Sequence, residues 1–217
     1  MGFKGWVAML CAAAVLSGCA SFRNNEIADA GALPDVSGYQ NKPSVFVETH
    51  FFRGEPGAPV TEILVNRDKI HELVGKSLGD SGMFSRHSFD EADKAGADYT
   101  LRLDIYNHGN TGLAMAAGFI SGFTFGVIPA AATDNYTLEA KLADTSGTVV
   151  SKATNKDSIT TWIGLVFIPA MAATPEKALT GTLDNQLKTV LKELVEGGKL
   201  KYSDVMRRRA APVFAGA

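Results

Sequence analysis

Cysteine is almost absent from this chain of 217 residues. Its two cysteines, Cys11 and Cys19, both lie within the first nineteen positions. The rest of the sequence therefore has no disulfide framework, no cysteine metal site and no cysteine nucleophile.

The chain also lacks an excess of charge of either sign, with a formal net charge of −2. Lys4 is the only charged residue before Arg23, and without Lys4 the chain has 20 basic and 23 acidic residues, a formal charge of −3. Domains that bind nucleic acid carry a clustered excess of Lys and Arg. The composition therefore argues against a nucleic-acid partner.

Residue combinations typical of catalytic or metal sites are missing as well. The four histidines are scattered, at His50, His71, His87 and His108, and no pair has the spacing of metal ligands. Ser85-Arg86-His87 lacks the context of a nucleophile elbow. The acidic run Asp90–Asp93 is most simply a solvated loop or helix start. We therefore expect a non-enzymatic protein without catalytic residues, bound metal or cofactor.

The amino terminus does carry an informative pattern. Lys4 precedes an apolar stretch, Trp6–Leu16, that is shorter than the roughly 20 residues of a membrane-spanning helix. A basic start, a short apolar core and a small-residue site are typical of a secretory signal. The stretch ends in Leu16-Ser17-Gly18-Cys19, which resembles the lipobox of bacterial lipoproteins at all four positions. The alternatives are an ordinary signal peptide with a chance cysteine, or an N-terminal membrane anchor.

The resemblance to a lipobox implies cleavage before Cys19 and covalent lipid on that residue. The sulfur would carry a diacylglycerol and the amine a third acyl chain. Two or more acyl chains hold a protein stably on a membrane. By the same resemblance, Ala20 favours the outer membrane, with the protein facing the periplasm.

Four segments are expected along the chain. Residues 1–18 are the signal peptide, and residues 19–43 carry the lipid and form a flexible tether, because they lack periodicity and contain several Gly, Pro and Asn. Residues 44–198 form the folded domain. Residues 199–217 include Arg207–Arg209 and form a basic, disordered tail.

The domain pattern predicts strands and helices in a fixed order. Alternating or β-branched runs predict strands over 44–52, 98–107, 135–142 and 148–159. Apolar residues at helical spacing predict helices over 60–78 and from Thr174-Pro175-Glu176 to Gly197. The order β-α-β-β-β-α predicts an α/β fold of the two-layer α+β type. Its four-stranded mixed sheet has two helices on one face, and Arg102 pairs with Asp104 on the other.

Two runs carry a family resemblance, Leu78–Phe84 and Ala97–Leu103. There a helix ends, a short strand follows and Ala-Asp-Tyr opens the next strand. This arrangement resembles the small domain of auxiliary lipoproteins of ABC-type lipid transporters and the amino-terminal domain of TolB. The resemblance covers about residues 44–198 and implies a fold more than a function.

Two apolar inserts, residues 112–132 and 162–173, interrupt this pattern without any charge. If the first two strands are parallel, both inserts leave the sheet at the same pole. Gly118, Gly122 and Gly126 are spaced as in a glycine zipper and would permit close helix contact. A spanning helix here would separate adjacent strands. The pattern therefore favours a re-entrant or interfacial hairpin or an oligomer seam, followed by inserts that fold back over the core, and a spanning helix is the least favoured alternative.

These inserts supply the candidate contact residues for a membrane or an oligomer. They are Gly118, Phe119, Gly122, Phe123, Phe125, Gly126, Ile128, Trp162, Leu165, Phe167 and Ile168. Such an apolar surface is unusual on a soluble monomer. The leading hypothesis is a lipid-anchored envelope protein whose inserts contact membrane lipid, an envelope protein or other copies. The alternative is a lipid- or hydrophobe-binding module of an envelope transport system, with a cavity between helices and inserts.

Overall fold

A computed structural model describes residues 18–63, 67–109, 121, 124, 127–197, 200 and 202. Their strands form one sheet in the order β1-β7-β6-β5-β2-β3, with β4 also paired to β2. The elements are β1 (Gly18–Arg23), β2 (Ser44–Arg53), β3 (Thr61–Glu62), α2 (Arg67–Ser81), β4 (Arg86–Ser88), η1 (Glu91–Gly96), β5 (Tyr99–Asn107), β6 (Ala130–Asp144), β7 (Val149–Gly164), η2 (Leu165–Ala170) and α4 (Pro175–Glu196).

The series β2-α2-β5-β6-β7-α4 confirms the predicted α+β class and element order. β2 and β5 are parallel, while β5, β6 and β7 are successively antiparallel. The predicted number of strands was wrong, because the sheet has seven rather than four. The three additional strands, β1, β3 and β4, are six, two and three residues long. β3 and β4 contain too few residues to display a period, and β1 pairs with a strand about 140 positions away in the sequence.

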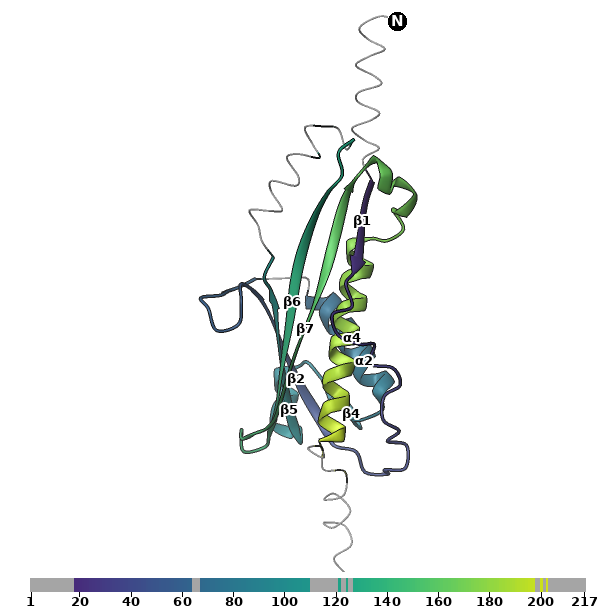
Figure 1. Ribbon diagram of the computed structural model, residues 1–217. Helices are drawn as coiled ribbons and strands as arrows, with labels where there is room; N and C mark the ends of the chain where they lie inside the picture. The colour runs from purple at the N-terminus through teal and green to yellow at the C-terminus, as the bar shows by residue number, and fades with distance from the viewer. Residues whose placement is uncertain are drawn as a thin grey trace, which may run out of the picture.

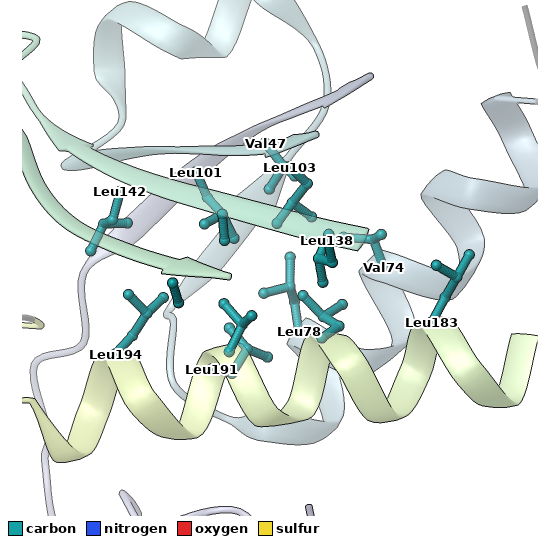
Figure 2. Close-up of a cluster of buried hydrophobic side chains, with 14 of the residues drawn as sticks. Val47, Val74, Leu78, Leu101, Leu103, Leu138, Leu142, Leu183, Leu191 and Leu194 are labelled. Atoms are coloured by element: carbon teal, nitrogen blue, oxygen red, sulfur yellow. The ribbon is translucent and has the colours of Figure 1, made fainter. Parts of the chain in front are cut away.

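Both long helices lie on one face of the sheet and bury the core against it. Figure 2 shows Leu101 and Leu138 of the strands directed toward Leu191 of α4 and Leu78 of α2. These side chains are almost fully buried, and each contributes roughly 1.5–3 kcal/mol relative to an exposed position. The alternating residues of β5 and β6 therefore hold the two helices in place.

α2 begins later than predicted. The expected helix started at Val60, but Thr61 and Glu62 form β3 and pair with Arg53 and Phe52 of β2. Ile63 also donates its backbone N–H to Phe51 O at 2.9 Å. Pairing with an existing strand edge thus competes successfully with the helical spacing of the apolar residues.

β6 and β7 are much longer than their neighbours and extend beyond the main sheet (Figure 1). β5 ends at Asn107, which pairs with Tyr136, so residues 130–135 of β6 lie past the end of β5. There β6 pairs with β7, and β7 pairs on its other side with β1. A three-stranded extension thus rises from one end of the domain.

Residues 19–43 differ from the flexible tether that the sequence predicted. Residues 18–23 are strand β1, and Ala20 and Ser21 are buried. The partner strand β7 is about 140 positions away in the sequence, so no local sequence pattern predicts this pairing. At the other end, Leu200 and Tyr202 are buried and Tyr202 stacks on Tyr39, although the sequence placed both in a disordered tail. Residues 1–17 and 203–217 lie outside the described residues.

Candidate functional site

Exposed large apolar side chains gather at the end of the three-stranded extension. We call this surface the apolar pole; its members are Phe22, Val127, Ile128, Trp162, Val166 and Met171. Val127 and Val166 have 71% and 66% of their surface exposed. They come from β1, the segment before β6, the end of β7, and the η2 region. Three separate stretches of the chain, at residue 22, residues 127–128 and residues 162–171, therefore place apolar groups at one end of the molecule.

The second insert forms the turn that closes this end. β7 stops at Gly164, and η2 follows as one short 3₁₀ segment containing Pro169. The rings of Trp162 and Phe167 lie 5.3 Å apart, so η2 folds back toward the strand it leaves. Leu165 and Ile168 in the same turn are partly exposed.

Described residues of the first insert lie at the same end. Ser121 is buried and donates its hydroxyl to Ile163 O of β7 at 3.4 Å. Ile128 N donates to the Thr124 hydroxyl at 3.2 Å. The structure thus brings together Ile128, Trp162, Leu165, Phe167 and Ile168. The other candidate residues, Gly118, Phe119, Gly122, Phe123, Phe125 and Gly126, lie outside the described residues.

Cys19 also lies at this end, where sequence reasoning did not place it. Its backbone pairs with Ile163, the residue after Trp162. The Cys19 thiol is free and its residue is partly exposed. The sequence predicts a flexible tether over residues 19–43 between the lipid and the first strand of the domain. The β1–β7 pairing makes that tether unnecessary.

The face of the sheet opposite the helices carries a charged cluster centred on Asp104. Asp104 is only 1% exposed and accepts hydrogen bonds from Arg102 Nε at 2.9 Å and Lys141 Nζ at 3.2 Å. The expected pairing of Arg102 with Asp104 is therefore present. Two cations therefore neutralise the Asp104 carboxylate on the face of the sheet that α2 and α4 do not cover. We interpret this cluster as structural.

The histidines have structural contacts, and two of them, His71 and His87, lie against the same ring, that of Phe89. His71 of α2 stacks on Phe89 and lies 3.2 Å from the Thr49 hydroxyl, while His108 contacts the Thr137 hydroxyl at 2.8 Å. Burial lowers the pKa of both imidazoles below the ordinary value, with Arg67 adding to the effect at His71 and Lys156 at His108. Within the described part of the chain, three or more His, Cys, Asp or Glu side chains do not gather as metal ligands would.

Two hollows lie away from the apolar pole. An open groove of about 470 Å³ lies between the Gly31–Ser37 segment and the end of α2, with Lys42, Asp80 and Lys188 on its walls. A small hollow of about 10 Å³ lies beside His50 and Ile70. The cavity that a hydrophobe-binding module would need, between helices and inserts, is at neither position. Among the described residues, none of the helices has the length and apolar composition to cross a membrane.

Neither a known protein-family profile nor a curated protein matches the sequence. Several solved structures are similar, including the three that follow. A PelC dodecamer from Paraburkholderia phytofirmans has a TM-score of 0.36 and 12% identity over 81% of this chain and 97% of that one. A minor lipoprotein from Acinetobacter baumannii has a TM-score of 0.30 and 11% identity over 77% and 94%. A DUF4136 family protein from Bacteroides thetaiotaomicron has a TM-score of 0.31 and 8% identity over 86% and 98%.

These similar structures thus include a bacterial lipoprotein. A likeness at this level does not carry a function or an assembly state from one protein to another. The lipobox and the similarity to ABC-transporter lipoproteins and TolB stay predictions from the sequence.

Proposed function

We propose that this protein is a lipid-anchored, non-enzymatic component of the bacterial cell envelope whose apolar pole contacts the membrane. One observation supports this function above the others. Cys19, the residue that the lipobox marks for acylation, pairs with Ile163 at the end of the molecule where the exposed apolar side chains gather. The lipid and the apolar pole would therefore meet the same bilayer.

The chemistry of the apolar pole fits a membrane surface. Trp162 is partly exposed and is flanked by exposed aliphatic side chains on η2 and before β6. Tryptophan is enriched where headgroups meet hydrocarbon, because its ring is apolar and its N–H is polar. Contiguous exposed apolar surface on a folded domain marks a membrane or protein contact.

The anchor itself would rest on three acyl chains on Cys19, more than the two that stable attachment requires. Ala20 follows the acylated residue and favours transfer to the outer membrane. The domain would then stand in the periplasm. Acylation would also explain how this protein occupies an oxidising compartment with a single cysteine after residue 18.

Metabolic labelling with a clickable fatty acid tests this function directly. The full chain is expressed in a Gram-negative host beside Cys19→Ala, and inner and outer membranes are separated by density. We expect label on the wild-type protein in the outer-membrane fraction, and an intact mass equal to residues 19–217 plus one diacylglyceryl group and one N-linked acyl chain. The Cys19→Ala variant should carry no label. A wild-type protein without label, or one cleaved elsewhere, would contradict the proposal.

A further inference from the structure

We infer that the lipid anchor and the domain form one rigid body, so that the bilayer holds the apolar pole in a single orientation. This inference rests on the proposed function, because it takes Cys19 as the acylated residue. Its basis is the segment of residues 19–30, which we call the N-terminal strap. Lipidated domains with a flexible tether can rotate freely, whereas the contacts of this strap leave no slack next to the lipid.

The first part of the strap is held on both of its edges. In the strap, β1 pairs with β7 from Cys19 opposite Ile163 to Arg23 opposite Ile159. On the other side, Ser21 N donates to Ala173 O at 2.8 Å, just before α4 begins. The hydroxyls of Ser21 and Thr161 lie 2.8 Å apart across the two strands. The chain is therefore fixed within two residues of the lipid.

A buried carboxylate holds the middle of the strap. Asp157 of β7 is fully buried, and its Oδ1 accepts the backbone N–H of Glu26 at 2.9 Å. The guanidinium of Arg23 lies 3.9 Å from Asp157 Oδ2. A buried charge that loses its partner is strongly unfavourable. Moving the strap away would leave the Asp157 carboxylate without Arg23 and without the Glu26 N–H, which opposes the movement.

Asn185 of α4 holds the last part of the strap. Its Oδ1 accepts the backbone N–H of Ala30 at 2.8 Å, and its Nδ2 donates to Ala28 O at 3.2 Å. Asn185 is itself buried. Earlier in the strap, Asn24 Nδ2 donates to the Ser158 hydroxyl at 2.7 Å. The strap is thus bonded to β7 and α4, the two longest elements of the fold.

The rigid connection fixes how the molecule stands on the membrane. Antiparallel partners lie about 4.5–5.5 Å apart, so the acyl chains leave the protein next to Ile163 and one residue from Trp162. A flexible tether of 24 residues could instead reach up to ~80 Å. β7 has 16 residues and spans about 50 Å. The turn at Asp144–Thr148, at its far end (Figure 1), would then lie about that distance from the bilayer.

A distance measurement on the full, lipidated protein in vesicles tests the orientation. Because Cys19 is acylated, Thr145→Cys in the far turn supplies a unique thiol for a spin label, and spin-labelled headgroups mark the bilayer surface. We expect one narrow distribution near 50 Å. In a second variant, Ala-Ser and then a twelve-residue Gly/Ser linker are inserted directly after Cys19. The Ala-Ser keeps the two natural residues next to the lipidated cysteine. The distribution of this variant should broaden by about 20 Å.

The matched control carries the same linker between Gly57 and Ala58, an exposed turn, and should keep the narrow distribution. Asn185→Ala supplies a second test, with Lys192→Ala on the same helix as its control. Amide hydrogen exchange at residues 28–30 should accelerate at least tenfold in Asn185→Ala only. A wild-type distribution as broad as that of the linker variant, or unchanged exchange in Asn185→Ala, would overturn the inference. Either result leaves acylation of Cys19 intact, whereas an unlabelled Cys19 contradicts the proposed function itself.

Discussion

Asp157 and Asp104 are both almost fully buried, but their partners differ in a way that separates two roles. Asp104 is neutralised within the sheet by Arg102 and Lys141. Asp157 accepts the Ser158 N–H of its own strand, and it also has two partners in the N-terminal strap, Arg23 and the Glu26 N–H. A carboxylate satisfied by its own sheet stabilises only the sheet. A carboxylate that also binds a distant segment helps to determine where that segment lies.

Two partly buried histidines give stability a pH dependence. The pKa values of His71 and His108 are lowered in the folded protein, so the unfolded chain binds more protons just below the ordinary value of about 6.5. The contribution of these two histidines to the free energy of unfolding should therefore be fully present above pH 6.5. It should be lost as the pH falls below that value. Thermal unfolding at pH 7.5 and 5.5 checks this. The His71→Gln/His108→Gln variant should lose less Tm on acidification than the wild type. An equal loss would contradict the assignment.

At the scale of elements, α4 connects the apolar pole to the core. It begins immediately after the η2 turn, where the Thr174 hydroxyl accepts the N–H of Lys177 at 3.3 Å and Pro175 occupies the first helical position. Its buried residues then run along β6 and β7 to Leu194. The start of α4 therefore fixes the position of Ala173, whose carbonyl accepts the N–H of Ser21 in β1.

Removing the N-cap should destabilise this connection. Thr174→Ala leaves the Lys177 N–H without its acceptor, and we expect a loss of about 1 kcal/mol in the free energy of unfolding, measured in urea. Thr180→Ala is the control, because that hydroxyl bonds only to carbonyls within its own helix. An unchanged free energy in Thr174→Ala would show that the helix start is held by packing alone.

The sequence predicted those elements whose residues carry a period. The alternation in β5 and β6 and the Thr-Pro-Glu start of α4 gave correct strands and a correct helix start, and the apolar run around Trp162 indicated the exposed end. It did not predict β1, because the residues that bury Ala20 and bind Arg23 lie more than 130 positions away. For the same reason, sequence reasoning missed Asp157 and Asn185. Their importance depends on which segment lies against them.

At the scale of the molecule, the two ends of the long strands would lie at different distances from the proposed membrane. The end of β7, which carries Trp162 of the apolar pole, lies at one end of the molecule, and α4 finishes toward the other end (Figure 1). Tyr202, six residues after the end of α4, stacks on Tyr39. Long strands held by one long helix resist bending, since each residue of β6 pairs with β7 over nearly its full length. A domain of this form would carry its distal surface far from the bilayer at a fixed height.

Trp162 offers a direct measure of this arrangement, because Trp6 and Trp162 are the only tryptophans and Trp6 precedes the lipobox. In vesicles, we expect its emission to shift to shorter wavelength and to be quenched by brominated acyl chains, as for an interfacial ring. Val127→Glu/Val166→Glu places charges on two strongly exposed positions of the apolar pole and should reduce the quenching at least twofold while acylation continues. Val149→Glu, exposed at the far end of β7, is the control and should leave quenching unchanged. If brominated lipid fails to quench the wild-type emission, Trp162 does not meet lipid, and the apolar pole must contact another protein or a second copy of this chain.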